Sequence, residues 1–138
     1  MKFPERGRVY HSAVWMFAQS GEPGEIDIAE SSTGRVFSGF YYRESGKSED
    51  TVHHFGDYPV DPSEYHVYRF DWTQDRIWVR CDDELLGSCA IDAAAGDYHS
   101  LKQAFYVILN INAFDNMRGE YEEVSSILKT YIDYVRVY

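Results

Sequence analysis

The fold is decided by an alternating stretch in the first quarter of the chain, Gly24-Glu25-Ile26-Asp27-Ile28-Ala29-Glu30-Ser31. Acidic and apolar residues alternate in it, as they do in a β-strand with one face on a core. Ile26 and Ile28 then point to the core, and Glu25 and Asp27 share the opposite face. The stretch therefore predicts a half-buried strand.

Glu30 breaks this pattern. In a regular strand it would lie beside Ile26 and Ile28 in the core, where an unpaired carboxylate is very costly. Two solutions are open: the strand ends before Glu30, or a β-bulge near Ala29 absorbs one residue. The bulge returns Glu30 to the face of Glu25 and Asp27. Three carboxyl groups so close together cannot all ionise easily, so one proton should be retained, as a general acid requires.

The rest of the chain also reads as strands separated by turns. Turn residues lie at Thr73-Gln74-Asp75 and at the hairpin pair Asp82-Asp83. The helix signal is confined to one short candidate, residues 91–95, stopped by Gly96. Strands are predicted at Ala13–Phe17, Gly24–Ser31, Val36–Tyr42, His66–Trp72, Arg76–Cys81, Phe105–Asn112 and Tyr131–Tyr138. This spacing predicts an all-β sandwich that forms one domain over residues 1–138.

In two of the predicted strands, alternation divides the side chains between two faces. The side chains of Phe105, Val107, Leu109 and Ile111 form an apolar face, and those of Tyr106, Ile108, Asn110 and Asn112 form a face that becomes polar. The polar end indicates either a strand that lines a cleft or a strand that enters a loop. In the third strand, alternation places one of Tyr41 and Tyr42 on the face of the carboxyl groups.

Composition limits the classes of partner. The chain has 138 residues, of which 44% are hydrophobic and 17% aromatic, enough for one folded core. Its formal net charge of −10 disfavours nucleic acid and anionic membranes. No run approaches 18 apolar residues, so no membrane span is predicted. The N-terminal residues Met1-Lys2-Phe3-Pro4 lack a signal core, so the sequence itself encodes no export.

The metal-binding residue types are few and badly spaced. Cys81 and Cys89 form no zinc pattern, and across a two-residue hairpin loop Cys89 should lie opposite Arg76, so both are expected to be free thiols. The pair His53-His54 beside Asp57 lacks a third ligand at a fixed spacing and is interpreted as a polar loop. We therefore expect neither a metal nor a cofactor.

Several blocks, taken together, resemble glycoside hydrolase family 16, the laminarinase-type enzymes. The stretch from Glu25 to Glu30 resembles the family pattern of Glu, aliphatic, Asp, aliphatic, an optional bulge residue and Glu. The other matching blocks follow in the family's order: residues 13–17 with the Trp-containing strand, residues 65–73 with Phe-His-Thr-Tyr-x-x-x-Trp-Thr, residues 76–86 with the next hairpin, residues 105–110 with Phe-Tyr-Leu-Ile-Leu-Asn, and residues 132–138 with the closing strand.

The resemblance implies a concanavalin A-like jelly roll and a retaining endo-glycosidase that acts on a β-linked polysaccharide. By position, Glu25 would be the nucleophile, Glu30 the acid and base, and Asp27 their hydrogen-bonding neighbour. Trp15 would be a sugar-stacking platform, although it also reads as a core tryptophan. We expect Trp15, His11, Tyr41, Asn110 and Asn112 to bind substrate. A neutral β-1,3- or β-1,3-1,4-glucan fits the charge best, and the family implies an extracellular or cell-envelope location.

Two departures from the family pattern affect these expectations. His11 replaces an aromatic residue that commonly flanks the family's cleft, and the residues after Asn110 differ. The chain also begins almost at the Trp-containing strand, so the N-terminal part of the sandwich is expected to be missing. This leaves three interpretations: an enzyme, a carbohydrate-binding module or inactive fragment, and a homo-oligomer or partner chain that pairs with the open sheet edges.

Overall fold

The computed structural model describes residues 1–4, 10–19, 24–32, 34–43, 48–90, 103–113 and 129–138. All regular structure in these residues is β. The strands are β1 (Tyr10–Ala18), β2 (Gly24–Ser32), β3 (Arg35–Arg43), β4 (Asp50–Asp57), β5 (Tyr68–Trp72), β6 (Arg76–Cys81), β7 (Glu84–Ala90) and β8 (Phe105–Ala113). The predicted short helix at residues 91–95 lies outside the described residues. Within them, no helix is long and apolar enough to cross a membrane.

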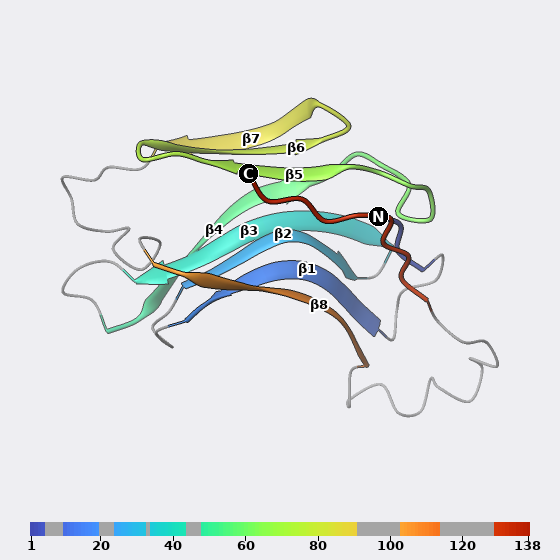
Figure 1. Ribbon diagram of the computed structural model, residues 1–138, viewed down its shortest axis with the longest axis horizontal. Helices are drawn as coiled ribbons and strands as arrows, with labels where there is room; N and C mark the ends of the chain where they lie inside the picture. Colours follow the sequence, from blue (N-terminus) through green and yellow to red (C-terminus); the bar gives the residue numbers. More distant parts are fainter. Residues whose placement is uncertain (5–9, 20–23, 33, 44–47, 91–102, 114–128) are drawn as a thin grey trace.

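The strands form two antiparallel sheets that face each other (Figure 1). One sheet has five strands in the order β4-β3-β2-β1-β8, and the other has three in the order β5-β6-β7. The five-stranded sheet is arched, and the three-stranded sheet lies over its convex side. The all-β sandwich predicted from the strand spacing is confirmed.

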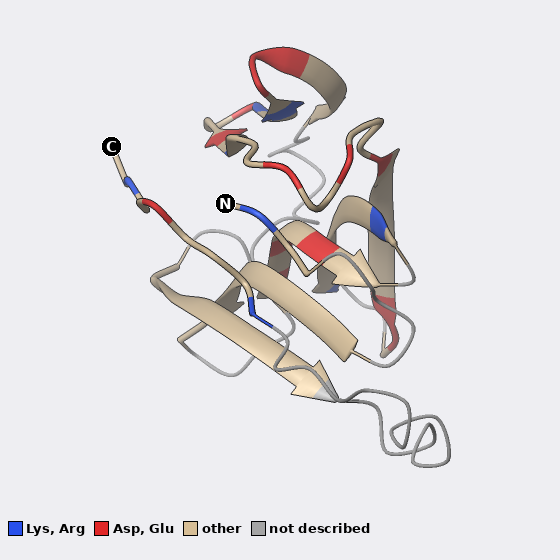
Figure 2. Cartoon of the chain, turned by 90° about the vertical axis from the view of Figure 1, so that its right-hand side faces the viewer, with Lys and Arg blue, Asp and Glu red and all other residues tan. Residues whose placement is uncertain are grey.

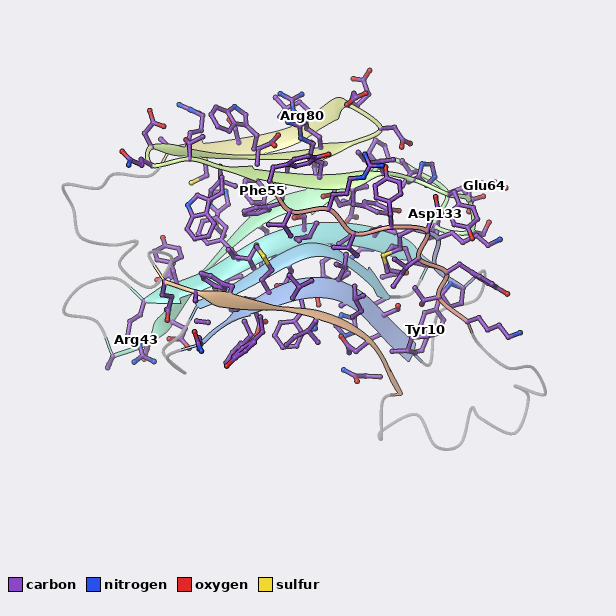
Figure 3. The ribbon with its side chains drawn as sticks, in the orientation of Figure 1. Tyr10, Arg43, Phe55, Glu64, Arg80 and Asp133 are labelled. Carbon is purple, nitrogen blue, oxygen red and sulfur yellow. The ribbon has the colours of Figure 1, made fainter. Side chains whose placement is uncertain are left out.

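The core lies between the sheets because each strand presents apolar residues to the other sheet at every second position. Ile26, Val36 and Phe40 of the large sheet pack in one cluster with Ile77 and Val79 of β6. All five side chains are fully buried. Figure 3 shows Phe55 of β4 between the sheets, where its ring lies against Gly87 of β7. The opposite face of the large sheet is therefore turned away from the core.

Two strand predictions were wrong. Residues 50–57 were interpreted as containing a polar loop, but they form β4, which pairs with β3 along its length. Residues Tyr131–Tyr138 were predicted to be a strand, yet the described contacts include one bridge, between Lys2 and Tyr131. Alternation alone does not make a strand, because a strand also needs a hydrogen-bonding neighbour.

The apolar face of β8 is also less buried than its sequence predicts. Val107, Leu109 and Ile111 point to the core side of the sheet, but each is 42–44% exposed. β8 is an edge strand, and the small sheet contacts the large one mainly through β2 and β4, with Trp72 of β5 reaching Phe105 at the start of β8. Among the described strands, β8 thus has an apolar side that no second layer covers.

The β6–β7 hairpin confirms one expectation and corrects another. Asp82 and Asp83 have φ of 49° and 70°, which is the backbone of a two-residue turn with both residues left-handed. Cys81 and Cys89 are both free thiols, as expected. Cys89, however, lies opposite Ile77 rather than Arg76 because the pairing shifts by one residue between Val79 and Arg80.

Candidate active site

A β-bulge in β2 brings the three acidic side chains onto one face. On the β1 side, Asp27 pairs with Trp15 and Ala29 with Val14, so Ile28 has no partner. On the β3 side, the pairing shifts between Asp27 and Glu30. Of the two solutions that the sequence left open, the bulge near Ala29 is therefore the one that is confirmed. Ala29 is fully buried on the core side, and Glu25, Asp27 and Glu30 share the opposite face.

The bulge is held by two hydroxyl groups that the sequence did not single out. Ser38 Oγ donates a hydrogen bond of 2.7 Å to the carbonyl oxygen of Asp27. Tyr58 Oη donates one of 2.9 Å to the carbonyl oxygen of Ile28. Both residues are buried, and burial raises the pKa of Tyr58 well above its usual value. Because a bulge disrupts the ladder, these bonds satisfy carbonyls at the disrupted position.

The cross-strand register defines the rest of this surface, which we call the carboxylate face. Residues paired across strands point to the same side of a sheet. The face comprises His11, Ala13, Trp15 and Phe17 of β1; Glu25, Asp27 and Glu30 of β2; Phe37, Gly39 and Tyr41 of β3; Val52, His54 and Asp57 of β4; and Tyr106, Ile108, Asn110 and Asn112 of β8. All eight predicted site residues lie on it.

Register also resolves the choices that the sequence left open. Tyr41 pairs with Glu25 and belongs to the carboxylate face, whereas Tyr42 packs against the core. Trp15 lies on the carboxylate face rather than in the core cluster, and its Nε1 donates a hydrogen bond of 2.7 Å to Asn110 Oδ1. The polar end of β8 therefore belongs to the same surface as the acids.

Burial and mutual repulsion raise the pKa values of two of the acids. Burial is the largest cause of the raised pKa of Glu25, followed by repulsion from Glu30, and His11 acts in the opposite direction. Asp27 is only 3% exposed, and burial, then Glu30 and then Glu25 raise its pKa to about 8. The pKa of Tyr41 is raised by burial and by the same three acids. Asp27 therefore keeps its proton at neutral pH.

Glu30 has a histidine partner within the same face. His11 Nε2 lies 2.6 Å from Glu30 Oε1. Acidic and basic positions both occur on each of the two sheets (Figure 2). The carboxylate face thus combines a buried proton carrier, two further carboxyl groups and a partner for one of them. Such a surface is suited to proton transfer and nucleophilic attack on a neutral substrate.

Among the described residues, one group has ligand atoms close enough for a metal ion. It consists of His66, Cys81 and Asp82, whose ligand atoms lie within 4.8 Å of one another on the small sheet. His66 Nδ1 contacts Asp82 at 2.6 Å and His66 Nε2 contacts the Asp61 carbonyl oxygen at 3.0 Å. Burial raises the pKa of the Cys81 thiol to about 12. His66 and Asp82 already bond one another, and the Cys81 thiol would have to lose its proton before it could bind a metal, so the group suits a metal poorly.

The pair His53-His54 forms no metal site. The two side chains lie on opposite faces of β4. His53 stacks on Phe40 with 5.1 Å between the ring centroids, and His54 pairs across from Gly39. Neighbouring residues of a strand point to opposite sides, so they cannot bind one ion together.

A two-sheet sandwich with three acids on one sheet face has the arrangement of the β-sandwich glycoside hydrolases. The family described as glycosyl hydrolases family 16 matches residues 1–135, and the chain belongs to that family. No curated protein matched the sequence.

Solved structures share the fold. LamAcat from Zobellia galactanivorans superposes with a TM-score of 0.66 at 20% identity over 82% of this chain and 51% of that one. The laminarinase from Rhodothermus marinus superposes with a TM-score of 0.63 at 23% identity, over 81% of this chain and 51% of that one. The laminarinase catalytic domain from Thermotoga maritima MSB8 superposes with a TM-score of 0.59 at 25% identity, over 81% of this chain and 50% of that one. The chain therefore spans about half the length of these structures.

Proposed function

We propose that this chain carries the catalytic strand of an endo-acting glycoside hydrolase that cleaves a neutral β-glucan with retention of configuration. The observation that carries the proposal is the bulge in β2, which places Glu25, Asp27 and Glu30 on one sheet face. Solved relatives of similar fold are described as laminarinases and as a non-specific endo-β-1,3(4)-glucanase. The net charge of −10 favours a neutral polymer over a sulfated one.

In the first step, protonated Glu30 gives its proton to the glycosidic oxygen as the bond from that oxygen to the anomeric carbon breaks. A carboxylate oxygen of Glu25 forms a bond to the same carbon, giving a covalent glycosyl-enzyme. In the second step, Glu30 takes a proton from water while the water oxygen attacks the anomeric carbon. The bond to Glu25 breaks and the sugar is released with its original configuration.

Asp27 lies between the two glutamates and remains protonated, because its pKa is about 8. A neutral carboxyl group can donate a hydrogen bond to the Glu25 carboxylate without adding a third negative charge. Trp15 offers an indole face for sugar stacking, and its hydrogen bond to Asn110 fixes the ring. Tyr41 and Asn112 supply further polar groups on the same face.

The test is reducing-sugar release from laminarin, mixed-linkage glucan, agarose and carrageenan. Glu25→Gln should lower release from the preferred polymer by at least about a thousandfold, because the nucleophile is lost. Binding to that polymer in affinity electrophoresis should persist. The matched control is Glu64→Gln, an exposed glutamate outside the carboxylate face, which should keep wild-type release.

Comparable release by Glu25→Gln and the wild type would refute the assignment of the nucleophile. A second candidate, a glycan-binding domain without activity, is favoured by the exposed core-side face of β8. Polymer binding by a folded wild-type chain that releases no sugar from any of the four substrates would establish that candidate instead.

A further inference from the structure

The contact between His11 and Glu30 is the closest side-chain pairing described on the carboxylate face. His11 Nε2 and Glu30 Oε1 are 2.6 Å apart, and the two side chains are 22% and 15% exposed. On the neighbouring strands, Glu30 pairs with Ala13 of β1 and with Phe37 of β3, neither of which offers a polar side chain. Water is thus largely replaced around this carboxyl group, and a hydrogen bond to it is correspondingly stronger.

The register of β1 and β2 explains why the two side chains meet. Ala13 is directly opposite Glu30, and His11 is two residues earlier on the same face of β1. His11 is therefore a diagonal neighbour of Glu30, within reach of a long side chain. On its other side His11 pairs with Asn112 of β8. The bulge is essential to this contact, because a regular strand would turn Glu30 toward the core.

We propose that His11 is a positioning residue for the acid and base carboxyl group of Glu30, an inference that rests on the proposed function. His11 holds Oε1, which turns Oε2 toward the glycosidic oxygen and makes it the atom that carries the transferred proton.

The hydrogen bond from His11 matters most when Glu30 becomes negatively charged during the reaction. When Glu30 loses its proton to the leaving oxygen, it becomes a carboxylate beside Glu25 and Asp27, and each of these has a pKa raised in part by Glu30. The Nε2–H group of His11 donates a hydrogen bond to the new carboxylate and opposes this repulsion. His11 also acts on Glu25, whose pKa it lowers. The histidine therefore favours the charge distribution that follows proton transfer.

The experiment compares leaving groups in aryl β-glucan oligosaccharides. Loss of a phenol with a high pKa needs protonation, whereas dinitrophenol leaves almost unaided. His11→Phe keeps the ring size but removes the nitrogen. We expect its kcat/KM to fall about 10- to 100-fold for the phenyl substrate, a part of the usual contribution of a general acid, and by less than about threefold for the dinitrophenyl substrate.

His11→Gln is the matched conservative variant, because its amide can reach Glu30 with a donor. It should recover most of the activity on the phenyl substrate. Circular dichroism of both variants establishes that they fold. Equal losses on the two substrates, or no loss on either, in a wild type that hydrolyses both would overturn the role of His11 and leave the proposed function intact.

A second measurement does not depend on activity. The ¹⁵N chemical shift of His11 Nε2 should change in Glu30→Gln and stay unchanged in Glu64→Gln, and an unchanged shift in Glu30→Gln would overturn the contact. A folded wild type that cleaves neither aryl substrate would refute the proposed function and, with it, the positioning role of His11. The shift change would then establish the contact alone.

Discussion

Replacing Asp27 with asparagine should remove much of the dependence of stability on pH. The folded chain raises the pKa of Asp27 from 3.8 to about 8, mainly because the side chain is buried. Between these two values the folded chain binds a proton that the unfolded chain has lost. The free energy of unfolding therefore falls as the pH rises from about 4 to about 8. Below pH 4 both states are protonated and the effect vanishes.

The size of this fall in the free energy of unfolding follows from the difference between the pKa values of Asp27 in the unfolded and the folded chain. One proton changes the free energy of unfolding by about 1.4 kcal/mol per pH unit, so Asp27 contributes a fall of at most about 5 kcal/mol between pH 4 and pH 8. Asp27→Asn has the same shape and carries no charge. It should match the wild type within about 1 kcal/mol at pH 4 and exceed it by several kcal/mol at pH 8. A smaller fall remains in the variant because the pKa of Glu25 is also raised.

The assay is urea unfolding followed by circular dichroism at unit steps from pH 4 to pH 8. The matched control is Asp57→Asn on the same sheet face, since Asp57 is exposed and paired with Arg35 at 3.0 Å. That variant should keep the wild-type slope. Parallel curves for Asp27→Asn and the wild type would refute the conclusion that Asp27 is held protonated by its surroundings.

Two further predictions concern the frame of the site. Gly39→Ala should lower the free energy of unfolding by about 1–3 kcal/mol, because the new Cβ would lie 2.9 Å from the backbone oxygen of His53, which cannot rotate away. A free energy of unfolding in urea within about 0.5 kcal/mol of the wild-type value would contradict this. Tyr58→Phe leaves the Ile28 carbonyl oxygen without its hydroxyl donor and should cost about 1–3 kcal/mol in the same assay. The exposed Tyr65 provides the control as Tyr65→Phe, and equal stability of the two variants would argue against the bond to the bulge.

The sequence reduced the end of this strand to two solutions, a bulge or an end before Glu30, because only one side chain broke the alternation. Ile26 and Ile28 fixed which side of the strand faces the core, and Glu30 could not join them without a high cost in free energy. The same local reasoning located the two-residue turn at Asp82 and Asp83. Where a single strand or turn carries the physical constraint, the sequence therefore located the feature or left few alternatives.

Features that depend on distant residues could not be predicted in this way. β4 contains polar residues and Gly56, and it becomes a strand because β3 pairs with it from Asp50 to Asp57. The hydroxyl of Tyr58 reaches Ile28 across 30 positions of sequence, and no local pattern signals that contact. Residues 131–138 show the converse, since alternation typical of a strand is present without a described ladder. Tertiary pairing outweighs local propensity in each case.

The bulge in β2 also makes this strand tolerant of a change in length. Removing one residue from an ordinary strand inverts every side chain beyond the deletion. Here five residue steps, from Glu25 to Glu30, cover four steps of the ladder, so excising Ala29 would leave both flanks on their present faces. The chain can therefore lose one residue between its two glutamates without exchanging inside and outside. What would change is the twist of the strand and the partners of Ser38 and Tyr58.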